Sequence, residues 1–183
     1  MKEEFIKKYN NYEYISTDLY LNVLANYSDA VPSNFNIDTY NDIVLEKLYL
    51  LNKDYFDNFY KDIDPNIKLD KEQCKAILSD EKYSLIIAGA GTGKTTTMAS
   101  KVKYLVEKKN VLPEKILVLS YTRKATEELD KRICLDFNIS AHVTTFHSLG
   151  YEYIREIFNN RKCVILDRNK KREIFLEYFK NLY

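Results

Sequence analysis

The stretch LIIAGAGTGKTTT, residues 85–97, constrains the fold more than any other part of the chain. Four apolar residues lead into alternating glycines, and a lysine and three threonines follow. Glycines let the backbone turn its N–H groups toward one point, and a helix that begins at the lysine adds the positive end of its dipole. A loop of this kind between a strand and a helix predicts a binding site for the phosphates of a nucleoside triphosphate.

The stretch follows the phosphate-loop pattern G-x-x-x-x-G-K-[ST] from Ala88 to Thr95, with alanine in place of the first glycine. The remaining glycines still free the backbone to turn around a pyrophosphate. We expect Lys94 to reach the β- and γ-phosphates and the Thr95 hydroxyl to bind Mg²⁺, so these two are the candidate catalytic residues. ATP and Mg²⁺ are the predicted cofactors. The predicted nucleotide-binding residues of the loop are Ala88, Gly89, Ala90, Gly91, Thr92, Gly93, Lys94, Thr95 and Thr96.

Charge divides the chain into two parts. Residues 1–66 hold 6 lysines and 12 acidic residues, whereas residues 67–183 hold 22 basic and 15 acidic residues. This asymmetry predicts an acidic N-terminal appendage and a basic unit able to meet a polyanion, although the net charge of the whole chain is only +1. The sequence contains no run of about 18 apolar residues and no secretory signal, so it predicts no membrane contact and a cytoplasmic location.

Beyond the appendage, apolar runs alternate with amphipathic stretches. Such alternation predicts an α/β fold in which helices cover both faces of a parallel sheet. The predicted strands are 83–90, 115–121 and 141–147, and the predicted helices are 94–110, 123–137, 149–158 and 169–183. The appendage itself is expected to be helical, because its apolar residues fall near one helical stripe, namely Ile43, Val44, Leu48, Leu51, Tyr55 and Phe59.

Two segments with candidate DNA-binding residues lie at the carboxyl ends of the second and third predicted strands. Thr122, Arg123 and Lys124 supply a hydroxyl and two cations, which suit a phosphodiester backbone. Phe146 and His147 offer flat faces on which an unpaired base can stack. Taken singly, the same residues also suit a solvated helix start and a core aromatic position. Because ligands of open parallel sheets bind at the carboxyl ends of the strands, we expect ATP and nucleic acid to lie along one edge.

Four segments follow one another along the chain in this order: LDKEQCKAI, the glycine loop, SYTRKATEEL and TTFHSLG. Through these segments the chain resembles superfamily 1 helicases of the Rep/UvrD type over residues 67–160. Their sequences are most similar to those of the DNA helicase IV branch. The resemblance implies a RecA-like fold and ATP hydrolysis coupled to translocation on single-stranded DNA and to duplex unwinding. It implies that Gln73 reads the adenine edge, although Asp70 predicts a capping box with the same side chain. The residues that it assigns to single-stranded DNA are Thr122, Arg123, Lys124, Thr145, Phe146 and His147.

The chain departs from this family in the residues that hold magnesium and complete the ATP site. Family members carry an Asp-Glu pair after a later strand, and arginines from a second RecA-like domain. Asp80-Glu81 precedes the glycine loop and Asp167 lacks a following glutamate, so neither is expected to be that pair. Residues 67–183 are therefore expected to be the incomplete N-terminal part of helicase domain 1A, inactive in unwinding by itself. Lys101 stands where the family often has a nucleotide-contacting arginine, whose planar fork lysine lacks.

Two other functions are compatible with the glycine loop alone. A small P-loop kinase needs an arginine-rich lid and an acidic acceptor-binding residue soon after the loop, whereas the Thr-Arg-Lys and Thr-Phe-His segments stand there instead. A nucleotide-sensing module without catalysis would use the tyrosine-rich residues 1–66 to bind a partner protein. The sequence therefore favours a helicase that binds single-stranded or partly duplex DNA.

Overall fold

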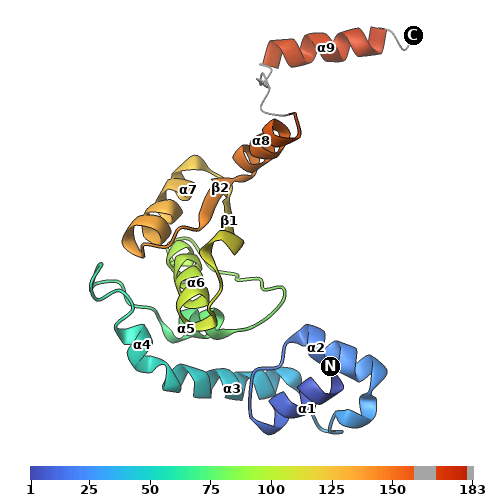
Figure 1. Ribbon diagram of the computed structural model, residues 1–183, viewed down its shortest axis with the longest axis vertical. Helices are drawn as coiled ribbons and strands as arrows, with labels where there is room; N and C mark the ends of the chain where they lie inside the picture. The colour runs from blue at the N-terminus through green and yellow to red at the C-terminus, as the bar shows by residue number, and fades with distance from the viewer. Residues whose placement is uncertain (159–167, 181–183) are drawn as a thin grey trace.

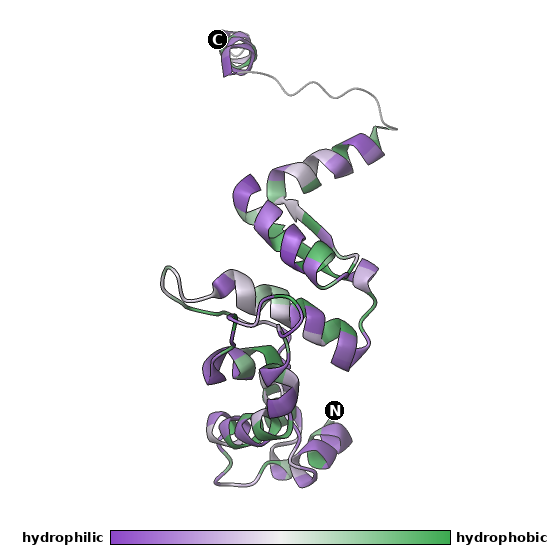
Figure 2. Cartoon of the chain, turned by 90° about the vertical axis from the view of Figure 1, so that its left-hand side faces the viewer, coloured by the Kyte–Doolittle hydropathy of each residue, from purple (hydrophilic) through white to green (hydrophobic). Residues whose placement is uncertain are grey.

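Helices dominate the computed structural model, which describes residues 1–158 and 168–180 (Figure 1). Hydrophilic and hydrophobic residues are mixed within single helices (Figure 2), and no helix in the described ranges is long and apolar enough to cross a bilayer. The N-terminal helices lie at one end of an elongated chain, and α7 and α8 lie toward the other. The helices are α1 (Lys2–Asn10), α2 (Thr17–Asn26), α3 (Ile37–Leu51), α4 (Lys53–Asp57), α5 (Lys71–Leu78), α6 (Lys94–Lys109), α7 (Arg123–Asp130), the π-helical turn η3 (Lys131–Asp136), α8 (Phe146–Ile157) and α9 (Arg168–Lys180), with short 3-10 turns at Ser28–Ala30 and Pro113–Lys115.

The described residues contain one pair of parallel strands, β1 (Leu117–Ser120) and β2 (His142–Thr145). Helix α7 and η3 form the connection between them. The second and third predicted strands are thus confirmed, although both are shorter than predicted, and α6 begins at the residue predicted for it. A strand, a helix and a parallel strand form the βαβ unit that alternation predicts. Its core also includes α6 and consists of Ala99, Val102, Val118, Leu129, Ile133, Ile139 and Ala141.

The first predicted strand, residues 83–90, does not form. The segment pairs with neither β1 nor β2, and Leu85 and Ile87 are 85% and 89% exposed. Among the described residues, no backbone–backbone hydrogen bond involves residues 80–92. A strand inside a sheet needs neighbours that take its N–H and C=O groups, and an apolar run does not say whether such neighbours exist. The predicted sheet is therefore present only as its β1–β2 part.

The N-terminal helices enclose a small core of their own. Asn41 on α3 exchanges two hydrogen bonds with the backbone of Ile15, of 3.1 and 2.7 Å. The rings of Tyr9, Phe35 and Tyr40 pack with centroids 5.3 to 5.6 Å apart. Aromatic pairs at such distances add to the stabilisation from buried area. The buried apolar residues of this core are Phe5, Ile15, Leu19 and Val23.

The single apolar stripe predicted for the N-terminal segment is only partly present. Val44 and Phe59 are buried as predicted, but Ile43 is 61% and Leu51 is 72% exposed. Helix α3 ends at Leu51, and Asn52 separates it from the short α4. Leu48 and Tyr55, on either side of Asn52, both pack against the core that contains Phe59, so the exposed positions of the predicted stripe are Ile43 and Leu51 of α3.

Helix α5 links the N-terminal helices to α6. On one side, Glu46 of α3 forms ion pairs with Lys71 and Lys75 of α5, at 2.8 and 3.1 Å. On the other, Lys101 Nζ of α6 donates to the carbonyl of Ile77 at 2.6 Å. The domain boundary stays a prediction, since residues on both sides of it share a core made of Phe56, Phe59, Tyr60, Cys74, Ile77, Leu78 and Tyr104.

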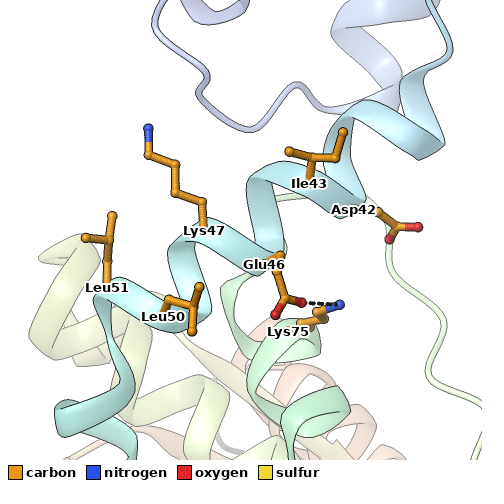
Figure 3. A pocket seen from close by; sticks show the side chains of 7 residues that line it. All are labelled: Asp42, Ile43, Glu46, Lys47, Leu50, Leu51 and Lys75. Carbon is orange, nitrogen blue, oxygen red and sulfur yellow. Dashed lines mark ion pairs between the residues drawn. The ribbon is translucent and has the colours of Figure 1, made fainter.

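A cavity of about 690 Å³ lies along α3 (Figure 3). Figure 3 shows Ile43, Lys47 and Leu51 on one side of the helix, and Glu46 directed toward Lys75 of α5. The cavity shares no lining residue with the cavity at the glycine loop. The lining of this cavity combines aliphatic side chains with an ion pair between Glu46 and Lys75, which is suited to packing and not to catalysis.

Tyr14 ties the N-terminal helices to the segment after α5. Its hydroxyl donates to Glu81 Oε1 at 2.9 Å and lies 3.4 Å from Ser79 Oγ. Burial, aided by the Glu81 carboxylate, raises the pKa of Tyr14 from 10.0 to about 12. The unfolded state therefore loses this proton at a lower pH than the folded state does, so the stability that the phenol contributes is present below pH 10 and lost above it.

We expect the free energy of unfolding to fall between pH 10 and pH 12 by about 1 kcal/mol more in the wild type than in a Tyr14→Phe variant. This figure allows for solvent screening, because the side chain is only half-buried. Urea titrations of both proteins at the two pH values measure the difference. The other tyrosines are common to both proteins and cancel, so an equal pH dependence would contradict the prediction.

Candidate nucleotide and DNA sites

The glycine loop ends where α6 begins. Gly91 and Gly93 have φ angles of +77° and +79°, a left-handed conformation that glycine adopts at little cost. Gly93 is the N-cap residue of α6. A Cβ atom on Gly93 would lie 2.6 Å from Gln73 Nε2, whereas one on Gly91 would meet nothing within 4 Å. The first N–H groups of α6, which lack intrahelical partners, thus directly follow a tight turn, as a phosphate site requires.

Lys94 folds back over the loop. Its Nζ donates to the carbonyl of Ala88 at 3.1 Å and to the carbonyl of Gly89, and the Thr92 hydroxyl donates to the same Gly89 carbonyl at 2.8 Å. Neutral carbonyls are weaker acceptors for an ammonium than phosphate oxygens are, so a polyphosphate can replace them. The donors of this loop therefore fit a nucleotide. The remaining predicted loop residues lie between Ala88 and the first turn of α6, and they are Ala90, Gly91, Gly93, Thr95 and Thr96.

Gln73 binds both the start of its own helix and the glycine loop. Asp70 Oδ1 accepts the Gln73 N–H at 2.8 Å and Gln73 Oε1 accepts the Asp70 N–H at 2.9 Å, so the predicted capping box is confirmed. Gln73 Nε2 also donates to the carbonyl of Thr92 at 3.0 Å. Nothing in the local spacing predicts this second contact. The amide carries one further hydrogen, and its assignment to the adenine edge stays a prediction.

A cavity of about 180 Å³ lies between the start of α5 and the glycine loop. Ile86 and Ile87 form an apolar part of its wall, and Gln73, Thr92 and Lys94 form a polar part. Ligand sites commonly combine apolar walls with a few polar groups in this way. Its volume is below the roughly 300 Å³ of small ligand pockets, so a bound nucleotide would be only partly enclosed.

Lys101 supports the end of α5. Its Nζ donates to the carbonyls of Ile77 and Ser79, at 2.6 Å each. Carbonyls at the end of a helix have no intrahelical partner, and this ammonium supplies one. Burial lowers the pKa of Lys101, and the Asp80 carboxylate opposes that shift. In this structure the Lys101 ammonium is thus bound to the carbonyls at the end of α5.

The two predicted DNA-binding segments meet at one end of the strand pair. Ser120 pairs with Thr145, so the residues that follow each strand leave the sheet side by side. Thr122 Oγ1 accepts the Ala125 N–H at 3.2 Å and caps α7. Thr145 Oγ1 accepts the Ser148 N–H at 3.1 Å and caps α8. Both threonine hydroxyls are thus used to start a helix.

The residues predicted to bind DNA differ in how exposed their side chains are. Arg123, Lys124 and His147 are exposed, and Phe146 is 66% exposed. Thr145 is only 8% exposed. The Thr145 hydroxyl serves the start of α8, and a contact of this residue with DNA stays a prediction. The exposed residues offer two cations and two flat rings at one strand edge.

Tyr121 lies at the same edge and was not among the predicted residues. It follows β1 directly and is 87% exposed. In the sequence, Tyr121 is the last residue of an apolar run, so it resembles a core position. Its place directly before the Thr-Arg-Lys segment is the signal that would have made it a candidate DNA-binding residue.

The acidic residues near the glycine loop have structural partners. Asp80 pairs with Lys109 at 2.9 Å, and Glu81 accepts hydrogen bonds from Tyr14 and Thr17. Within residues 1–158 and 168–180, no three His, Cys, Asp or Glu side chains gather as a metal site. Asp167 lies outside the described residues.

A glycine loop that ends at the first residue of a helix, next to a parallel βαβ unit, is typical of the P-loop class of nucleotide-binding proteins. Within that class, residues 69–182 match the family model described as the UvrD/REP helicase N-terminal domain. The chain belongs to the UvrD/REP helicase family.

The relatives of the chain carry helicase names. The chain is 36% identical over 97 residues to "DNA helicase II" of Rickettsia typhi, which is 50% of this chain and 14% of that protein. It is 31% identical over 120 residues to "ATP-dependent DNA helicase PcrA" of Staphylococcus aureus, or 62% of this chain and 16% of that protein. A "Probable DNA helicase II homolog" of Mycoplasma capricolum is 35% identical over 113 residues, 58% of this chain and 16% of that protein. The chain thus spans about a sixth of these relatives, and a closer relation to the helicase IV branch stays a prediction.

Proposed function

We propose that this chain supplies the ATP-binding loop and one wall of the single-stranded DNA path of an ATP-dependent DNA helicase, acting in the cytoplasm. The observation that carries the proposal is the glycine loop at the start of α6, with Lys94 held over it and Gln73 bound to it. Membership of the UvrD/REP family supports ATP and DNA as the ligands.

In this proposal the loop holds the polyphosphate of ATP. Lys94 leaves the loop carbonyls and binds the β- and γ-phosphates, where it offsets the charge that develops on the γ-phosphoryl group during transfer. The Thr95 hydroxyl, in the first turn of α6, binds Mg²⁺, which supplies further charge neutralisation when it is present. Gln73 reads the adenine edge with its second amide hydrogen.

The strand edge holds the DNA. Arg123 and Lys124 bind phosphates, which gives affinity without sequence preference. Phe146 and His147 stack on unpaired bases, which favours single strands over duplex. A strand path and an ATP site on the same unit are two of the parts that translocation requires, and the chain spans only 14% and 16% of the two relatives' length.

Replacing Arg123 and Lys124 together by alanine is expected to weaken the binding of a single-stranded oligonucleotide. Each lost phosphate contact reduces the slope of log affinity against log salt by about 0.7, so the double variant should lose about 1.4. Fluorescence anisotropy titrations at several salt concentrations measure this slope. The matched control is Lys53→Ala with Lys61→Ala, two exposed lysines of the N-terminal segment, and an equal loss there would contradict the assignment.

The proposal as a whole is tested by binding and turnover of MgATP, with and without single-stranded DNA, by purified residues 1–183. We expect nucleotide and single-stranded DNA to bind, and turnover to be slow. Failure to bind nucleotide would overturn the proposal. Nucleotide binding without any affinity for DNA would favour the non-catalytic module that uses residues 1–66 to hold a partner protein.

A further inference from the structure

The segment between α5 and α6 is held mainly at its two ends. No backbone–backbone hydrogen bond of the described residues involves residues 80–92, and Leu85 and Ile87 are largely exposed. On the side of the glycine loop, Lys94 Nζ donates to the carbonyls of Ala88 and Gly89, and the carbonyl of Thr92 accepts from Gln73 Nε2 at 3.0 Å. The wall at Ile86 and Ile87 therefore lies between this hold and the contacts that fix residues 79–81, and its position depends on both.

Glu81 fixes the near end to the start of α2. Its Oε1 accepts from the Tyr14 hydroxyl at 2.9 Å and from Thr17 Oγ1 at 3.1 Å, and its Oε2 accepts from the Thr17 N–H at 3.0 Å. Thr17 is the first residue of α2, so its N–H has no intrahelical partner. A carboxylate at this position also interacts favourably with the helix dipole. Glu81 is thus the capping partner of a helix that lies 64 residues earlier in the chain.

The neighbours of Glu81 are held from the opposite side. Lys109 of α6 forms an ion pair with Asp80 at 2.9 Å, and Lys101 of α6 donates to the Ser79 carbonyl at 2.6 Å. Residues 79–81 are therefore clamped between α2 and α6. The clamp joins the N-terminal helices to the helix that begins at the glycine loop.

We propose that Glu81 is a positioning residue of the nucleotide site, which fixes the near end of this segment so that Ile86 and Ile87 lie beside Gln73. The inference rests on the proposed function, because it assumes that the cavity at the glycine loop receives ATP. It gives residues 1–66 a role in nucleotide binding, since Tyr14 and the start of α2 become supports of the ATP site.

The first test is the affinity of residues 1–183 for a fluorescent ATP analogue with Mg²⁺. Glu81→Ala should bind about tenfold more weakly than the wild type, the effect of losing charged hydrogen bonds that order the wall. Glu81→Gln keeps one acceptor oxygen and should recover part of the affinity, which a mere loss of packing would not explain. Glu114→Gln, an exposed carboxylate in a 3-10 turn, is the matched control and should bind like the wild type.

The second test does not depend on nucleotide. The chain contains no tryptophan, so Tyr83→Trp, at a position 83% exposed, reports the mobility of the segment alone. Adding Glu81→Ala should lower the fluorescence anisotropy of this tryptophan, while far-UV circular dichroism stays unchanged. A fall in anisotropy with no ATP binding by the wild type would refute the proposed function and leave Glu81 as an anchor only. ATP binding that is unchanged in Glu81→Ala, with unchanged anisotropy, would overturn the inference and leave the proposed function intact.

Discussion

Replacing Lys94 by alanine is expected to lower the affinity of the chain for MgATP by about 100-fold. A charged hydrogen-bonding group aimed at a polyphosphate contributes up to about 3 kcal/mol, and about 2.7 kcal/mol corresponds to that factor. The side chain is exposed and bonds only to loop carbonyls, so its removal should leave the fold intact. Isothermal titration calorimetry of both proteins measures the difference.

The matched control for this variant is Lys115→Ala, which removes an exposed lysine from the turn before β1. Both variants lose one positive charge, so a general effect of net charge would weaken both alike. If Lys94→Ala retained the affinity of the wild type, the loop would hold something other than the β- and γ-phosphates, and the nucleotide assignment would have to be abandoned.

Replacing Gly93 by alanine is expected to lower the free energy of unfolding by about 2–3 kcal/mol. The new Cβ would lie 2.6 Å from Gln73 Nε2, and the φ angle of +79° is strained for any residue with a Cβ. Gln73 must then move, which breaks its hydrogen bond to the Thr92 carbonyl. Urea unfolding measures the loss, and the affinity for ATP should fall with it.

The Gly91→Ala variant separates the effect of backbone strain on stability from the effect of the clash with Gln73. Its φ angle of +77° brings the same strain, but the added Cβ meets nothing within 4 Å, so a loss of only about 1 kcal/mol is expected. Equal losses in the two variants would mean that the contact between Gln73 and the loop contributes nothing. Gly150 lies within α8 with open space around it, and alanine there should instead stabilise by about 0.5–1 kcal/mol.

Local patterns predicted the elements that depend on nearby residues. The capping box at Asp70 and Gln73, the start of α6 at Lys94 and the two strands around α7 all follow from spacing and apolar runs within about ten residues. The family motifs likewise located the glycine loop and the two strand ends. Each of these depends on short-range chemistry that the sequence displays directly.

Features that depend on distant residues were not predicted. The segment 83–90 has the composition of a buried strand, but pairing requires a neighbour, and no described strand lies beside it. Thr145 is buried at the end of β2, which its motif does not indicate. Glu81 reaches Thr17 across 64 residues, and no periodicity links the two. Sequence patterns report local preference, whereas these outcomes depend on which parts of the chain meet.

We expect the exposed segment from Leu85 to Ile87 to promote association of the protein at high concentration. Leucine and isoleucine with unpaired N–H and C=O groups form a template that strands of other molecules can extend, as exposed sheet edges do. This sticky stretch runs directly into the phosphate loop. A nucleotide that binds the ordered loop, as proposed, would draw molecules away from such associations by mass action. We therefore expect the proposed ligand of the loop also to keep the chain dispersed.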